Sequence, residues 1–163
     1  MARLTHFDTE GKAAMVDISA KDETERVATA RGSVIMQPST LKLVAGGNMK
    51  KGDVLAVARL AGIMAAKRTP ELIPLCHPIA LTSIAVDLSI DRKRNAVDIE
   101  ATCKLVGRTG VEMEALTAVS AAALTVYDMC KSVDRAMTIT DIHLSHKHGG
   151  KSGEYNSGKQ SGR

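Results

Sequence analysis

The sequence predicts an α+β protein with a ferredoxin-like βαββαβ sheet, helices on one face of the sheet and an extra helix in the first crossover. Three observations carry this prediction: the order of elements along 163 residues, a period-2 hairpin, and two long Ala-rich helical segments. The length corresponds to one domain, and 44% apolar residues predict a packed core. We expect an extended N-terminal arm over 1–24, a single domain over 25–148 and a flexible Gly/Ser/Lys-rich tail over 149–163.

The domain is predicted to begin with a strand and a short helix. Weak alternation of apolar residues over 25–37, ended by Pro38, predicts the strand. The segment PSTLKLVAGG predicts the short helix, because Pro38 stands near its start and Gly46 and Gly47 stand beyond its end.

A longer helix is predicted over 51–67, with Asp53 as its N-cap. Only Arg59 and Gly62 interrupt its apolar surface, so this helix must be covered on several sides, which indicates packing between subunits in so small a chain. The next segment, 68–79, holds three prolines and is predicted to be neither regular helix nor strand.

The second half of the domain is predicted to contain a hairpin, a helix and a last strand. Apolar residues alternate along both arms of the hairpin over 82–106, on either side of the charged turn DRKRN. A helix is predicted over 111–133, and its Ala, Ser and Thr residues allow another backbone to approach closely. The last strand is predicted over 136–146, where the alternation slips between Ile139 and Ile142 and indicates a β-bulge.

The composition argues against several classes of protein and indicates the kind of ligand and compartment to expect. Aromatic residues make up only 2% of the chain, which argues against the base-stacking platforms of RNA-binding modules. The net charge of +4 favours an anionic ligand without proving one. An odd number of scattered cysteines, no long apolar run and no signal-peptide core predict a cytoplasmic protein that does not span a membrane. With so few aromatic residues, we expect no nucleic-acid partner.

Two loop motifs are candidates for ligand binding. In LCHP, at 75–78, His77 lies between two prolines and can present a ring nitrogen to a ligand, although a surface loop with an incidental His shows the same pattern. In GRTGVEME, at 107–114, Glu112 and Glu114 open a helix. Their carboxylates either complement the helix dipole or accept hydrogen bonds from a ligand such as a guanine edge.

Charged residues on and around the helices supply two further candidates. Asp128 and Lys131 are three residues apart on a nearly apolar helix, which fits either a surface ion pair or a site in a cleft. Cationic side chains also gather near the helix ends and in the tail, where they suit a polyphosphate or are ordinary solvated charges. They include Lys50, Lys51, Lys67, Arg68, Lys147 and Lys151.

Two other kinds of site are not predicted. The GGKS sequence at 149–152 lacks the earlier glycine of a P-loop, because Ser145 stands at that position. His143, His146 and His148 do not share one strand face, and the cysteines lack a CxxC spacing, so no metal site is expected.

Four segments together resemble the molybdenum cofactor biosynthesis protein C family, the cyclic pyranopterin monophosphate synthases. They are MVDIS at 15–19, the segment from KGDV to LCHP at 51–78, the segment from GRTGVEME to YDMCKSVD at 107–134, and HGGKSG at 148–153. The resemblance covers nearly the whole chain, and the ordered occurrence of LCHP, GVEME and YDMCK is specific to the family.

The resemblance implies an activity and an assembly. Members of the family convert 3′,8-cyclo-7,8-dihydroguanosine 5′-triphosphate, which is made from GTP, into cyclic pyranopterin monophosphate and pyrophosphate. The implied protein is a lyase with a ferredoxin-like subunit that forms a homohexamer, a trimer of dimers, with sites at the subunit interfaces. No resident cofactor is implied, and a divalent ion bound together with the triphosphate is left open.

The resemblance also implies site residues by position. The catalytic aspartate falls on Asp128, and Lys131 and Lys51 match further catalytic positions. We expect Lys131 to donate a proton and contact phosphate, while Asp128 orients it or accepts a proton in turn. The implied substrate-binding residues are Leu75, Cys76, His77, Glu112, Met113 and Glu114, and the candidate phosphate contacts are Lys67, Arg108, Lys147 and Lys151.

A binding module on the same fold is the competing hypothesis, either an RNA binder or a ligand-sensing regulatory domain. The scarcity of aromatic residues and the lack of an aromatic RNA-binding signature on the predicted strands argue against RNA. A sensor would bind a nucleotide without turnover, so release of pyrophosphate distinguishes an enzyme from a sensor.

Overall fold

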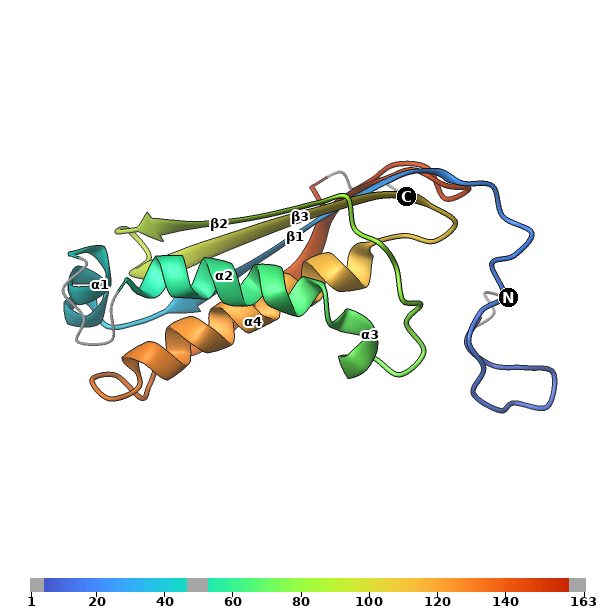
Figure 1. Cartoon of the computed structure of the whole chain (residues 1–163). Coiled ribbons are helices and arrows are strands. Elements are labelled where there is room, and N and C mark those ends of the chain that lie inside the picture. The colour runs from blue at the N-terminus through green and yellow to red at the C-terminus, as the bar shows by residue number, and fades with distance from the viewer. Residues whose placement is uncertain (1–4, 47–52, 159–163) are drawn as a thin grey trace.

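A five-stranded antiparallel sheet with helices on one of its faces forms the body of the protein (Figure 1). The structure is a computed structural model that describes residues 5–46 and 53–158. Its elements are β1 (Thr24–Ile35), α1 (Pro38–Ala45), α2 (Val54–Ala66), α3 (Thr69–Leu72), β2 (Ser83–Asp91), β3 (Ala96–Gly107), α4 (Glu112–Cys130), β4 (Thr138–His148) and β5 (Tyr155–Asn156). The strand order β2-β3-β1-β4-β5 places the ferredoxin-like order within the first four strands, which confirms the predicted fold class.

Two elements were not predicted. The expectation that 68–79 contains no helix is wrong, because α3 forms one turn there with Pro70 in its first turn, where a missing backbone N–H costs no hydrogen bond. The second is β5, which lies in the segment expected to be a flexible tail and pairs with His146 and Lys147 of β4. The local sequence around both elements is rich in proline or glycine, so its pattern indicates neither a helix nor a strand.

The predicted caps and irregularities are present where the sequence places them. The side chain of Asp53 accepts hydrogen bonds from the backbone N–H groups of Leu55 and Ala56, at 3.0 and 3.1 Å, and so caps α2. The bulge in β4 lies between Thr140 and His143, where the pairing with β1 shifts register, and Asp141 has a φ of 56°. Both predictions are confirmed.

Helix α4 packs closely against the sheet and against α2 because the contacting residues are small. The alanines on its inner side are fully buried. A Cβ atom added to Gly32 of β1 would lie 2.8 Å from Val119 of α4, and one added to Gly62 of α2 would lie 3.0 Å from the carbonyl oxygen of Ala118. The predicted close approach of another backbone to this helix is therefore confirmed.

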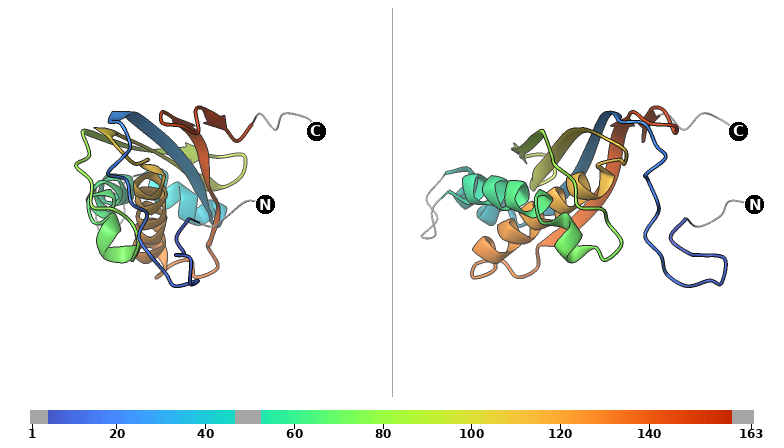
Figure 2. Two further views of the ribbon diagram at one scale, coloured as in Figure 1. Left: turned by 90° about the vertical axis from the view of Figure 1, so that its right-hand side faces the viewer. Right: turned by 45° about the vertical axis from the view of Figure 1, so that its right-hand side comes forward.

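The two ends of α4 reach opposite ends of the molecule. Its N-terminus lies on the same side of the molecule as α3, the N-terminal arm and the tail. Its C-terminus points away from them, as the two further views of the ribbon show (Figure 2). Near the C-terminal end, the buried carboxylate of Asp134 accepts hydrogen bonds from the Gln37 backbone N–H and the Thr40 hydroxyl, at 2.9 and 3.1 Å. This carboxylate joins the loop after α4 to the start of α1.

Two glycines make the sharp turn after β4. Gly149 and Gly150 have φ values of 103° and 76°, which favour glycine. A Cβ atom on Gly149 would lie 2.1 Å from the carbonyl oxygen of Glu25, and one on Gly150 would overlap the guanidinium of Arg26. The turn therefore brings the tail close to the start of β1.

We expect Gly149→Ala to lower the free energy of unfolding by about 2 kcal/mol or more, because it combines backbone strain with a clash against backbone atoms. Gly153→Ala is the matched control, since Gly153 also has a positive φ of 64° but has open space around its Cβ position. The control should cost about 1 kcal/mol. Denaturant unfolding of both variants measures the difference, and equal losses would show that the turn tolerates a side chain.

Candidate active site

Two neighbouring cavities meet at the N-terminus of α4. Their volumes are about 520 Å³ and 430 Å³, and both are lined by Thr109, Gly110 and Glu112. Together they are large enough for a nucleotide-sized ligand. We call the first the cationic cavity and the second the loop cavity, after the residues that line them.

The cationic cavity carries an excess of positive charge. Five cationic side chains line it, which are Lys21, Arg26, Arg108, Lys147 and Lys151, against the carboxylates of Asp22 and Glu112. Such a concentration of fixed cations suits a polyphosphate. The structure therefore brings together three of the four predicted phosphate contacts and adds Lys21 and Arg26, which the sequence analysis missed.

The cations come from elements far apart in the sequence. Lys147 of β4 donates hydrogen bonds to Glu112 at 3.0 Å and to the Ser152 hydroxyl at 2.8 Å, so it links α4 to the tail. Arg26 of β1 donates through Nε to the Gly107 carbonyl at 3.3 Å. No local motif marks Arg26, because only the pairing of β1 with β3 and β4 places it here.

The loop cavity contains every substrate-binding residue that the resemblance implies. It is lined by the loop after α3, the first turn of α4 and one residue of the N-terminal arm, His6. The implied residues that line it are Leu75, Cys76, His77, Glu112, Met113 and Glu114. LCHP and GVEME thus form one site although more than 30 residues separate them.

Glu114 is a buried carboxyl group with a thiol partner. The residue is only 2% exposed, and the Cys76 thiol donates to its Oε1 atom at 3.6 Å. Burial raises the pKa of Glu114 above its ordinary value of 4.5, and the nearby Glu112 carboxylate adds to the rise. Burial and the charge of Glu114 also raise the pKa of Cys76 to about 11, so the thiol stays protonated at neutral pH.

His77 is held by the N-terminal arm. Its Nε2–H donates to the carbonyl oxygen of Val16 at 2.7 Å. The bond fixes the orientation of the imidazole and leaves Nδ1 as the ring nitrogen available to a ligand. The expectation that LCHP presents a His to a site is thus supported by the loop cavity, with the additional finding that the arm orients the ring.

Asp128 and Lys131 form an ion pair at the opposite end of α4. Their side chains are 61% and 53% exposed, and the Lys131 ammonium lies 2.6 Å from the Asp128 carboxylate. A hydrogen bond and the charge of Asp128 raise the pKa of Lys131, which keeps its ammonium protonated. At 1.5 Å per residue, the 19 residues of α4 span about 28 Å, so one chain does not bring this pair to the two cavities.

The remaining predicted contacts lie elsewhere. Lys67 is exposed at the C-terminal end of α2 and lines neither cavity. Lys51, with Lys50, lies outside the residues that the structure describes. The described residues also hold no group of three or more His, Cys, Asp or Glu side chains arranged to bind a metal ion. Among the same residues, no helix is long and apolar enough to cross a membrane.

A ferredoxin-like α+β domain with two adjoining cavities, one of them lined by five cationic side chains, is the class of protein that the fold and the site define. A sequence model of the MoaC family matches residues 15–150, and the chain belongs to this family. The family predicted from LCHP, GVEME and YDMCK is therefore confirmed.

Curated relatives are similar over almost their whole length. A cyclic pyranopterin monophosphate synthase of Rhodospirillum rubrum is 66% identical over 152 residues, which cover 93% of this chain and 92% of the relative. Proteins of the same name from Parvibaculum lavamentivorans and Clostridium perfringens are 63% and 58% identical, and 96% and 98% of their lengths are covered. In both comparisons the matched residues make up 94% of this chain.

We expect Glu114→Gln to remove a pH-dependent destabilisation. The raised pKa means that the folded state holds the proton more tightly than the unfolded state, so the wild type loses stability as the pH rises above about 4.5. The amide cannot ionise, and its oxygen can still accept from Cys76. The variant should melt at a higher temperature than the wild type at pH 7.

The matched control is Glu100→Gln, which changes an exposed glutamate in an ion pair with Arg31. Melting temperatures measured from about pH 3 to about pH 8, on both sides of the ordinary glutamate pKa of 4.5, distinguish the two variants. The Glu114→Gln advantage should vanish at the acidic end. An advantage independent of pH, or none at pH 7, would contradict the role of burial.

Proposed function

We propose that this chain is a cyclic pyranopterin monophosphate synthase, a lyase of molybdenum cofactor biosynthesis. Its substrate is 3′,8-cyclo-7,8-dihydroguanosine 5′-triphosphate, and its products are cyclic pyranopterin monophosphate and pyrophosphate. Membership of the MoaC family and the names of the relatives confirm the predicted enzyme and its activity. The structural observation that carries the proposal is the joining of a cationic cavity to a cavity with a buried carboxyl group.

The two cavities match the two chemical parts of the substrate. The five cations of the first are suited to the triphosphate, and Glu112 and Glu114 of the second are suited to the N–H groups of the guanine-derived ring. Because Glu112 lines both cavities and also pairs with Lys147, it stands where the ring and the phosphates would meet. This division supports the substrate-binding roles implied for Leu75, Cys76, His77 and Met113.

The reaction closes a cyclic phosphate and expels pyrophosphate. A hydroxyl oxygen of the sugar-derived part forms a bond to the α-phosphorus and gives its proton to a general base, while the bond between that phosphorus and the oxygen bridging to the β-phosphate breaks. Fixed ammonium and guanidinium groups stabilise the charge that develops on the leaving pyrophosphate. Ring opening and reclosure need proton transfers, for which a carboxyl group with a raised pKa, such as Glu114, is suited.

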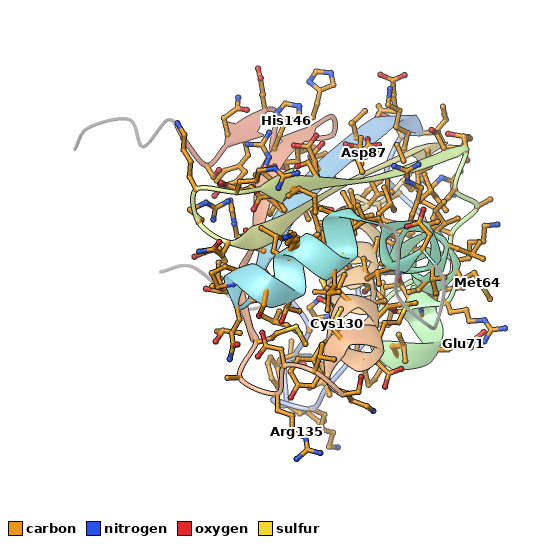
Figure 3. All side chains as sticks on the ribbon, turned by 90° about the vertical axis from the view of Figure 1, so that its left-hand side faces the viewer. Met64, Glu71, Asp87, Cys130, Arg135 and His146 are labelled. Atoms are coloured by element: carbon orange, nitrogen blue, oxygen red, sulfur yellow. The ribbon has the colours of Figure 1, made fainter. Side chains whose placement is uncertain are left out.

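Asp128 and Lys131 require a second copy of the chain to reach the cavities. We propose that the protein forms a homohexamer, a trimer of dimers, in which one copy supplies this pair to the cavities of another, and that Lys51 is a further catalytic residue. Exposed apolar side chains on α2 support subunit packing, since Leu60 is 58% exposed and Met64 lies on the outside of the molecule (Figure 3). A monomer would leave this surface in water.

We propose that the protein acts in the cytoplasm without a resident cofactor. The chain has three scattered cysteines, an odd number without a disulfide framework, which suits a reducing compartment. The cationic cavity offers only Asp22 and Glu112 as carboxylates, so a divalent ion would bind there mainly through the triphosphate oxygens. We propose that the chain forms a single catalytic domain over 25–148, flanked by the arm over 1–24 and the tail over 149–163.

Asp128→Asn should reduce release of pyrophosphate from the cyclised substrate by at least about 10²-fold, because the amide neither accepts a proton nor holds Lys131 by its charge. Glu100→Gln, in another exposed ion pair, should keep wild-type turnover. A pyrophosphate assay with melting curves for both variants checks this. Turnover by the wild type distinguishes an enzyme from a sensor, and near-normal turnover by Asp128→Asn would remove this residue from the chemistry.

Mixing two inactive variants tests whether two copies share each site. After subunit exchange, Asp128→Asn and Glu114→Gln chains should regain activity, because half of the random dimers are mixed and one of the two sites in each is intact, about one quarter of all sites. A mixture of Asp128→Asn with Lys131→Ala should regain none, since both changes lie at the same end of α4. Equal recovery in both mixtures, or none in either, would contradict a shared site.

A further inference from the structure

The N-terminal arm, residues 5–23, crosses both cavities. Its Lys21 and Asp22 line the cationic cavity, and its His6 lines the loop cavity. Between them, the Val16 carbonyl accepts the hydrogen bond from His77 at 2.7 Å. The arm therefore brings side chains to each part of the site and is anchored at a residue of the site itself.

His6 is held in place by a turn within the arm. The backbone N–H of Ala14 donates to the His6 carbonyl at 3.0 Å. The side chain of Asp8 closes the turn by accepting from the backbone N–H groups of Glu10 and Lys12, at 2.8 and 2.9 Å. These bonds use no atom of the imidazole, so the turn positions the ring without occupying it.

The Cys76 thiol and the Nε2–H of His77, two side-chain donors of the loop cavity, already have acceptors within the described part of the chain. Glu114 accepts from Cys76, Glu112 accepts from Lys147, and the Nε2 of His77 donates to the arm. No lysine or arginine among the described residues lines this cavity. His6 makes no side-chain hydrogen bond within the described part of the chain, so its imidazole is a polar group left for a ligand.

A guanine-derived ring presents both N–H donors and a carbonyl acceptor. The carboxylates of Glu112 and Glu114 can only accept when ionised, so they suit the N–H groups and repel the carbonyl oxygen. The carbonyl needs a donor on the same side of the cavity. Thr109 stands at the junction with the cationic cavity, whereas His6 lines the loop cavity alone.

We infer that His6 is a specificity-determining residue that donates an imidazole N–H hydrogen bond to the ring carbonyl of the substrate in the loop cavity. The inference rests on the proposed function and adds to it a contact from the arm. By this contact the protein selects an oxo-purine-derived ring over one that lacks the carbonyl, because only the former offers the exposed imidazole N–H an acceptor on the ring.

Binding of three probes to His6→Ala tests the inference. The probes are GTP, 2-aminopurine riboside triphosphate, which lacks the ring carbonyl, and inorganic tripolyphosphate, which lacks the ring. The variant should bind GTP about tenfold more weakly, as expected for one hydrogen bond. Its affinity for the other two probes should change by less than about twofold. Calorimetric titration of the full chain measures all three.

His6→Gln keeps an N–H donor and should retain more GTP affinity than His6→Ala. Lys12→Ala, which changes the tip of the same turn and lines neither cavity, should leave all three affinities unchanged. Equal weakening for all probes would show that the change displaces the arm, and unchanged GTP affinity would show that His6 makes no contact. Either result overturns the inference. Failure of the proposed function would instead appear as no pyrophosphate release by the wild type.

Discussion

The close packing of α4 against both the sheet and α2 is the constraint on which the rest of the structure depends. Gly32 and Gly62 present no side chain where α4 contacts the sheet and α2, and the buried residues Val119 and Ala118 of α4 lie against them. The interior gains its stability from many short contacts rather than from a few large side chains, which suits a chain with 2% aromatic residues. A helix packed this closely cannot slide without clashes, so both of its ends have fixed positions relative to the strands.

Different charged groups lie at the two ends of α4. At the N-terminus, Glu112 lies between two cavities, one with clustered cations and one with a buried carboxyl group. The cations are gathered by backbone geometry, because the turn at Gly149 and Gly150 folds the tail onto Arg26. At the C-terminus, the ion pair of Asp128 and Lys131 is exposed and lies about 24 to 28 Å from Glu112 along the helix, at 1.5 Å per residue. The dependence of the proposed activity on an oligomer follows from this length.

Much of the fold and half of the site could be predicted from the sequence, because those features depend on local patterns. Alternation of apolar residues determined the hairpin, Asp53 determined the start of α2, and the slip between Ile139 and Ile142 determined the bulge. The motifs LCHP and GVEME carried enough information, through the family resemblance, to identify the residues that line the loop cavity.

Only the tertiary structure decided which charges meet and which groups are buried. Arg26, Lys21 and His6 have no local pattern that separates them from solvated residues, and they reach the cavities through strand pairing and the path of the arm. Glu114 lies in the first turn of α4, and nothing in the local sequence distinguishes it from an exposed glutamate. The surrounding residues bury its side chain, and this burial raises its pKa. Sequence patterns report contacts within a few residues, whereas burial and charge clustering arise from contacts between segments far apart in the chain.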